Sequence, residues 1–288
     1  MLELGIGADI VRGIGLLIWL AFFACLAFAL WIGKNRRNKV MGAVLVILLF
    51  IAPAAPGIYR TVGYKHNYAK AKALFDERCK TAGEKVYRTV DGVEGVLLTA
   101  TRPDDRAANR ANPNWASAGL PNEAGGEDYV RSFLSWEHRQ YSDQRGYLNS
   151  EPVNPSGFQS FRGYRFVDVG EADGVVYRYR FERPPSSKLS RVPVTGEKAR
   201  YAVSFTNAID SNERALWVAG TTVKVTDTRS GELVALSTWY SIEPGQGDIG
   251  GARAPWGFAQ TCPNLLGSAE RSPTRYFVDQ ILKPIKGE

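Results

Sequence analysis

Residues 14–59 read IGLLIWLAFFACLAFALWIGKNRRNKVMGAVLVILLFIAPAAPGIY, and this stretch separates a membrane part from a folded domain. Its first 19 residues, 14–32, contain no charged side chain. An α-helix of that length crosses a hydrocarbon core of about 30 Å. A second uncharged run covers 40–59 and contains Pro53 and Pro56. We therefore predict a transmembrane hairpin within 1–60, with spans at about 14–33 and 40–58.

The connector between the two runs sets the expected orientation. Positions 34–39, KNRRNK, hold four positive charges, whereas the tail before the first run holds one positive and two negative charges. Short, positively charged loops stay in the cytoplasm. We expect the tail and the domain 61–288 to lie outside the cytoplasm, which describes a multi-pass protein of a bacterial inner membrane with a periplasmic domain.

The second run has an alternative interpretation as a signal peptide. KNRRNK resembles the basic region of such a peptide, and Ala52-Pro53-Ala54 resembles a small-residue cleavage site. We favour the two-span hairpin because a full-length apolar run already precedes this segment.

Three cysteines give independent information on the compartment. Cys25 lies in the first apolar run, where it acts as a small apolar residue. Cys79 and Cys262 lie near the two ends of the domain, and an even pair in an oxidising compartment predicts a disulfide. Closing so long a loop gives an upper figure of about 4 to 5 kcal/mol in the chain-entropy model. The alternative is two unrelated buried thiols.

Net charge disfavours nucleic acid as a partner. The chain has 36 Lys and Arg against 29 Asp and Glu, a formal charge of +7. Residues 1–55 contribute five positive and two negative charges, which leaves 31 minus 27, or +4, on the remaining 233 residues. A domain this weakly basic lacks the dense positive surface that nucleic-acid binding requires.

Hydrophobic periodicity after residue 61 predicts one α+β domain. Helices are expected at about 67–84, 127–141 and 272–283, and strands at about 85–90, 95–101, 164–169, 175–182, 200–206, 216–226 and 233–242. Turn signals join these strands as three hairpins around 91–92, 171–174 and 227–231, while 102–126, 142–163 and 184–193 read as loops. A mostly antiparallel sheet with flanking helices follows, and nothing indicates a parallel, doubly wound order.

The second hairpin concentrates arginines. If Gly170 pairs with Val175, Arg165 lies directly opposite Arg180, with Arg178 on the same outer face. One explanation is a positive patch for lipid head groups, cell-wall polymer or an acidic protein surface. The other is an edge strand that charge protects from aggregation. We favour the second explanation and retain the three arginines as candidate interaction residues.

A glycine-rich stretch at 244–263 supplies two further candidates. Trp256 lies there with Arg253, outside any expected helix or strand. Tryptophan and arginine are enriched at the centres of protein interfaces. We expect Trp256 to be exposed and to contact a partner together with Arg253.

Motifs for chemistry are weak throughout. The two histidines, His66 and His138, are far apart, no nucleophile elbow occurs, and the glycine-rich runs lack the context of a phosphate loop. We expect no catalytic residue, metal or cofactor. Glycoside hydrolysis needs only two carboxylates at about 5–10 Å, and the acids available for it are Asp104, Asp105, Glu127, Asp128, Asp168 and Asp173.

The expected function is therefore a non-enzymatic one. The tethered domain is predicted to bind a protein or another envelope component, while its two spans contact the lipid bilayer. Two versions compete, an accessory subunit of an envelope assembly and an immunity protein against a toxin that acts in the periplasm. A cell-wall-active hydrolase with paired carboxylates is the alternative, and a cleft with two facing carboxylates would favour it.

Overall fold

The computed structural model describes residues 5–53, 55–104, 110–135, 163–182, 188–265 and 271–285. The chain divides into two units, Met1–His66 and Asn67–Glu288. Each unit is described by itself below, as the first unit and the second unit.

The first unit is a helical hairpin. Helix α1 spans Gly5–Ile32, and its segment Gly13–Ile32, with a mean hydropathy of 2.5, is long and apolar enough to cross a membrane. Helix α2, Arg36–Ile51, packs against α1 where small side chains permit close approach. A Cβ atom on Gly42 would lie 3.2 Å from the Cβ of Ala29.

The second expected span is not one straight helix. Helix α2 ends at Ile51, and helix α3, Ala55–Cys79, continues at a bend of 61°. Pro53 lies at this break, and a proline in a helix interior removes a hydrogen bond and clashes with the preceding turn. Sixteen residues make a helix of about 24 Å, shorter than the apolar core of a bilayer. A second membrane span thus stays a prediction.

Helix α3 also begins earlier and ends earlier than the helix expected over 67–84. It ends at Cys79 because Gly83, with φ +112°, already opens a strand. Within the second unit its side chains Ala71 and Phe75 form a buried cluster with Tyr240. The predicted disulfide between Cys79 and Cys262 is confirmed, with 5.8 Å between the two Cα atoms.

The second unit is built on a nine-stranded sheet with the order β1-β9-β8-β7-β3-β4-β5-β6, and β10 also pairs with β9. Its strands are β1 Gly83–Val86, β3 Gly95–Leu98, β4 Phe166–Gly170, β5 Val176–Phe181, β6 Leu189–Pro193, β7 Tyr201–Asn207, β8 Val218–Asp227, β9 Leu233–Ile242 and β10 Gln260–Cys262. Strand β3 runs parallel to both β4 and β7, and the other pairs in this sheet are antiparallel. A small parallel pair joins β2 Val90–Val93 to β11 Leu282–Pro284. The α+β class and the mostly antiparallel sheet are confirmed.

Two of the three predicted hairpins form, β4 with β5 and β8 with β9. The first is wrong, because β1 pairs with β9, β2 with β11, and β3 with β4 and β7. The turn signal at Gly92 does not make a hairpin: Gly92 has φ +71° but lies inside β2, whose pairing with β11 shifts in register. Burial of Val96 and Leu98 at the centre of the sheet outweighs this local signal. Parallel pairing between distant strands leaves no local pattern in the sequence.

Strand β6 forms where a loop was expected at 184–193. It pairs with β5 along Leu189–Pro193 and ends the described order of strands. Proline is tolerated there because an edge strand does not need every N–H for the ladder. The proline-rich composition therefore misled the prediction.

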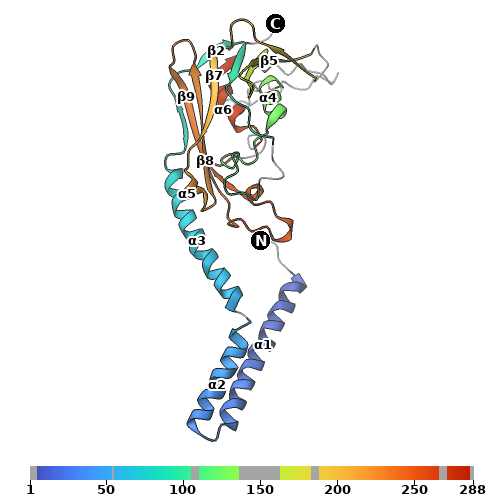
Figure 1. Ribbon diagram of the computed structural model, residues 1–288, viewed down its shortest axis with the longest axis vertical. Helices are drawn as coiled ribbons and strands as arrows, with labels where there is room; N and C mark the ends of the chain where they lie inside the picture. Colours follow the sequence, from blue (N-terminus) through green and yellow to red (C-terminus); the bar gives the residue numbers. More distant parts are fainter. Residues whose placement is uncertain are drawn as a thin grey trace. The chain divides into compact units, whose positions relative to one another are not determined.

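Helices α4, Gly126–Ser135, and α6, Pro273–Ile281, lie on the same side of strands β7 to β9 (Figure 1). They build the core on that face; for example, the rings of Trp239 and Phe277 lie 5.9 Å apart, edge to face. The helix expected over 127–141 is confirmed as far as residue 135, and 136–141 lie outside the described residues. The remaining elements are short: α5 Ser211–Arg214, η1 Gly250–Ala252 and η2 Pro255–Phe258.

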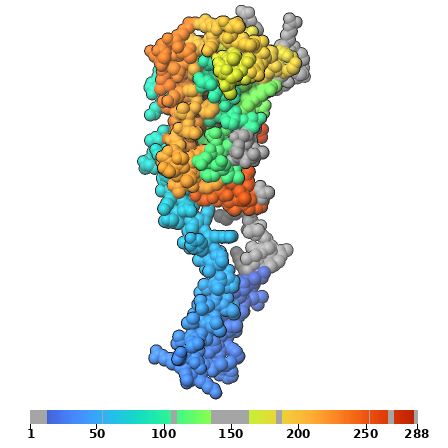
Figure 2. Space-filling model, viewed as in Figure 1, coloured from blue at the N-terminus to red at the C-terminus, as the bar shows by residue number. Residues whose placement is uncertain are grey.

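The opposite face of the sheet is covered in part by α3. Its side chains pack with Val218, Tyr240 and Ile242 at one end of β8 and β9. Figure 2 shows the cyan surface of α3 adjoining the orange surface of these strands.

A cluster of ion pairs surrounds Asp227, the last residue of β8, and makes the stability of the domain depend on pH. Asp227, whose side chain is fully buried, accepts hydrogen bonds from Arg200 at 2.7 Å and from Arg88 at 2.7 Å. The bond from Arg200 is the main reason that the pKa of Asp227 is lowered. A lowered folded-state pKa contributes stability above the unfolded value of about 3.9, and that contribution is lost as pH falls toward the folded value.

We therefore expect Asp227→Asn to lower the melting temperature at pH 7, with a difference from the wild type that shrinks as pH falls below about 4. Thermal unfolding followed by circular dichroism between pH 2.5 and 7 measures this. Glu232→Gln, which changes an exposed acid 3.9 Å from Arg88, is the control. A difference independent of pH would show that the carboxylate charge is not what stabilises this end.

Candidate functional site

One face of the sheet carries a surface that the described part of the domain leaves largely open. Residues paired in register point to the same side of a sheet. One row across the strands is Lys85, Leu236, Lys224 and Ser204, and a second is Thr226, Ala202, Leu97, Asp168, Arg178 and Val192. Phe166 and Arg180, two positions along β4 and β5, complete this set, which we call the open sheet face. Most of its side chains are half-buried or exposed.

An arginine and phenylalanine stack lies on the β4–β5 part of the open sheet face. The guanidinium of Arg178 lies 3.8 Å from the ring centre of Phe166 and donates to both oxygens of Asp168, at 2.7 and 2.8 Å. The guanidinium of Arg180 lies 5.5 Å from the same ring. Asp168 is fully buried and also accepts from the N–H of Ala199 at 2.7 Å. Asp168 thus fixes Arg178.

The predicted register of this hairpin is wrong by one residue. Gly170 pairs with Val176, and the N–H of Glu171 donates to the carbonyl of Val175, so the loop has three residues. Gly174, with φ +78°, supplies the left-handed residue that such a loop requires. A slip of one residue changes every cross-strand partner. Arg178 therefore faces Asp168, and the expected like-charge pair of Arg165 with Arg180 does not exist.

Arg165 is separate from the other two arginines. It precedes β4, points to the other side of the sheet from Arg178 by alternation, and pairs with Glu94 at 3.1 Å, with both side chains more than half exposed. An exposed pair of this kind contributes about 0–1 kcal/mol. The structure therefore brings Arg178 and Arg180 together and leaves Arg165 outside the open sheet face.

Three cations on the open sheet face have no ion-pair partner among the residues that the structure describes: Lys85, Lys224 and Arg180. All three are exposed. Leu236 lies in register between Lys85 and Lys224, and Val192, which is 53% exposed, lies on β6 in register with Arg178. The sequence alone did not single out Lys85 or Lys224, although Lys224 interrupts the valine alternation of β8 on the outward side.

The glycine-rich loop does not offer the expected exposed anchor. Trp256 is fully buried in η2, where its indole N–H donates to the carbonyl of Asn112 at 2.9 Å and its ring lies 5.4 Å from that of Trp217. Arg253 pairs with Glu243, which is also bonded by the N–H groups of Gly245 and Gly247 at 2.8 and 2.7 Å. These contacts hold the loop together, and the expected exposure of Trp256 is wrong, while a partner contact of Arg253 stays a prediction.

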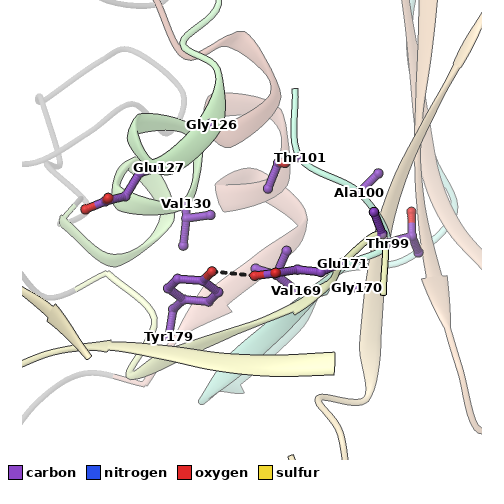
Figure 3. A pocket seen from close by; sticks show the side chains of 11 residues that line it. Thr99, Ala100, Thr101, Gly126, Glu127, Val130, Val169, Gly170, Glu171 and Tyr179 are labelled. Carbon is purple, nitrogen blue, oxygen red and sulfur yellow. Dashed lines mark hydrogen bonds between the residues drawn. The ribbon is translucent and has the colours of Figure 1, made fainter. Parts of the chain in front are cut away.

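A cavity of about 590 Å³ lies on the other side of the sheet, at the carboxyl ends of the parallel strands β3 and β4. Helix α4 connects these two strands, so the three elements form a βαβ unit. Ligands of open sheets bind in the crevice beyond the carboxyl ends of parallel strands. The cavity is lined by Thr99, Ala100, Thr101, Gly126, Glu127, Val130, Val169, Gly170, Glu171, Ala172 and Tyr179 (Figure 3).

Glu171 and Tyr179 form the polar side of this cavity. The Tyr179 hydroxyl donates to one oxygen of Glu171 at 2.6 Å, and Arg191 donates to the other at 2.5 Å. Burial, followed by the bond to Glu171, raises the pKa of Tyr179 to about 12, so its hydroxyl stays protonated. Neither residue was a candidate from the sequence, because the β4–β5 turn and α4 are brought together only by the fold.

Three of the carboxylates considered for hydrolysis, Glu127, Asp168 and Asp173, do not face one another. Glu127 lines the cavity, but its side chain points away from Glu171 and pairs with Arg131 (Figure 3). Asp168 pairs with Arg178 on the other face, and Asp173 is bonded within the turn by the N–H of Val175 at 2.9 Å. Asp105 lies outside the described residues. Glu127, Asp168 and Asp173 thus form no cleft with two opposed acids.

Metal ligands are not clustered in the part of the chain that the structure describes: no group of three or more His, Cys, Asp or Glu side chains is placed to hold an ion. His66 is exposed, and His138 lies outside the described residues. Comparison of the chain with protein-family models, with curated proteins and with solved structures finds no match, so the site rests on its own geometry.

Proposed function

We propose that this chain is a membrane-tethered, extracytoplasmic binding protein whose open sheet face docks an acidic protein partner. The observation that carries the proposal is the set of three cations, Lys85, Lys224 and Arg180, that have no ion-pair partner among the described residues and lie on the open sheet face. They come from β1, β8 and β5, which are not adjacent in the sheet, so they spread positive charge across this face. An acidic surface would neutralise them on contact.

The chemistry around the cations suits a protein interface. Leu236 and Val192 supply apolar area on the same face, and the Arg178–Phe166 stack supplies a rigid planar group. Interfaces combine an apolar centre with arginine and aromatic anchors, and charge complementarity steers the encounter. Because Asp168 already holds Arg178 in place, little side-chain freedom is lost on binding.

The tether and the compartment are part of the same proposal. The apolar helix segment Gly13–Ile32 supports a membrane anchor, and the positive connector before α2 supports a cytoplasmic loop between two spans. A disulfide between Cys79 and Cys262 is typical of an oxidising compartment such as the periplasm. A multi-pass inner-membrane protein with an external binding domain accounts for all three features.

Binding is favoured over hydrolysis because Glu171 is held by Arg191 and Tyr179, and because Glu127 points away from it. A general acid needs a carboxyl that keeps its proton, and an arginine partner opposes this. An accessory subunit of an envelope assembly and an immunity protein remain the two versions of the binding role.

A photo-crosslinking amino acid at Leu236 in intact cells tests the proposal. We expect a covalent adduct with an acidic protein, and about a tenfold loss of adduct when Lys224 and Arg180 are both changed to Glu, since each tenfold corresponds to about 1.4 kcal/mol. The same probe at Ile249, exposed in the glycine-rich loop, is the control site. Adducts of equal yield at both sites, or adducts insensitive to charge reversal, would contradict the docking face.

The identity of the adduct separates the two versions. An envelope protein of the same cell supports the assembly subunit. An adduct that forms only when toxin-producing cells are mixed in supports the immunity protein.

A further inference from the structure

We propose that the cavity between β3, β4 and α4 is a second binding site, for a neutral hydroxylated ring such as a single sugar residue. Its volume of about 590 Å³ falls within the range of about 300–1,000 Å³ that ligand pockets occupy. The proposal goes beyond the docking of a protein on the open sheet face.

Close backbone contacts build the walls of the cavity. A Cβ atom on Gly170 would lie 3.0 Å from the carbonyl oxygen of Thr99, so the ends of β3 and β4 approach more closely than side chains usually allow. Gly126, with φ +56°, opens α4 where a Cβ would lie 2.9 Å from that of Asp104. These contacts set the position of Thr99, Glu171 and the first turn of α4 before any ligand arrives.

The polar groups of the cavity suit alcohols. Each oxygen of Glu171 accepts one protein hydrogen bond, from Tyr179 or Arg191, and keeps a second acceptor site. Thr101 adds a hydroxyl that both donates and accepts. Val130 and Val169 supply an apolar surface that matches the C–H face of a sugar ring. A sugar ring carries hydroxyl groups that donate and accept hydrogen bonds and an apolar C–H face. The lining of the cavity is complementary to both.

Charge argues against an ionic ligand. Acids in the first turn of α4, Glu127 and Asp128, oppose an anion at this helix end. A cation would compete with arginines that already pair with the two lining carboxylates, Arg131 with Glu127 and Arg191 with Glu171. A neutral ligand displaces neither pair.

The cavity is independent of the docking face. Arg178 and Tyr179 alternate along β5, so the open sheet face and the cavity lie on opposite sides of the sheet. A failure of sugar binding therefore leaves the protein-docking proposal intact, and the reverse also holds.

Titration of the full-length protein in detergent with glucose, N-acetylglucosamine and glucosamine at pH 6, followed by NMR of labelled tyrosines, tests the site. We expect saturable shifts of the Tyr179 signals with a neutral sugar, at a Kd of about 1 mM or below. Tyr179→Phe and Glu171→Gln are expected to weaken binding about three- to tenfold, as removal of one hydrogen bond or one charge-assisted acceptor does. For Tyr179→Phe the binding is read from the remaining tyrosine nearby, Tyr177, and by calorimetry.

Glu94→Gln, the same change at an arginine-paired acid that does not line the cavity, is the matched control and should bind the sugar as the wild type does. Unchanged melting temperatures show that the variants fold. Absence of any saturable shift, equal binding by Glu171→Gln, or tighter binding of the protonated glucosamine than of the neutral sugars would each overturn the proposal.

Discussion

Replacing Cys79 and Cys262 together with serine is expected to lower the free energy of unfolding of the second unit by about 3–5 kcal/mol. The bond joins residues 183 positions apart, so it removes much of the freedom of the unfolded chain. It also fixes the end of α3 to β10, beside the cluster of Ala71, Phe75 and Tyr240. Urea unfolding of the full-length protein in detergent, followed by near-ultraviolet circular dichroism, measures this change in the free energy of unfolding.

Cys25→Ser is the matched control, since Cys25 is a free cysteine in α1 and makes no bond. It should leave the urea midpoint unchanged. Reductant should lower the midpoint of the wild type and leave the double serine variant where it is. A double variant as stable as Cys25→Ser would show that the second unit does not depend on the bridge. An impermeant maleimide on intact cells should label Cys79 and Cys262 only after reduction if the unit lies outside the cytoplasm.

Glu123→Ala is expected to destabilise the second unit by about 3–5 kcal/mol, because it leaves a buried charge without its partner. Arg102 and Glu123 have side chains only 2% and 1% exposed and are joined at 2.7 Å. The other oxygen of Glu123 accepts from the N–H of Thr274 at 2.9 Å, in the first turn of α6. Ser272 stands at the N-cap position of that helix but makes no side-chain cap bond, so Glu123 takes this role.

The same urea measurement tests this, with Glu94→Ala as the control. Glu94 also pairs with an arginine, Arg165, but on an exposed site, and its loss should cost less than about 1 kcal/mol. Changing Arg102 and Glu123 together to methionine should cost less than Glu123→Ala, since no buried charge is then left. If Glu123→Ala and Glu94→Ala cost the same, the buried pair does not hold α6 in place.

Local features of the chain were readable from the sequence. The length of the first apolar run predicted the membrane-crossing segment Gly13–Ile32. Alternation of apolar and polar residues on either side of a five-residue turn predicted the hairpin of β8 and β9. Two cysteines in a domain expected to lie outside the cytoplasm gave the disulfide. The apolar segment and the strands depend on residues that are neighbours in the sequence. The disulfide follows from the tendency of paired cysteines to bond outside the cytoplasm. None of these predictions needs tertiary information.

Other features were decided only by the tertiary structure. The partners of β1, β2 and β3 are distant in sequence, and burial of the central strands overrode the turn signal of Asp91-Gly92. A difference of one residue in the turn determined that Arg178 meets Asp168 and that Arg180 does not lie opposite Arg165. Burial of Trp256 depends on the segment around Asn112 that accepts its N–H.

Both candidate sites belong to this second class. The cations of the open sheet face that lack an ion-pair partner in the described part of the chain come from β1, β5 and β8, and the cavity joins the β4–β5 turn to the first turn of α4. The sequence by itself determined which segments are apolar, extended or cross-linked. Only the tertiary structure decided which side chains face one another, because contacts between distant segments are selected by the burial of the whole core and not by any local preference.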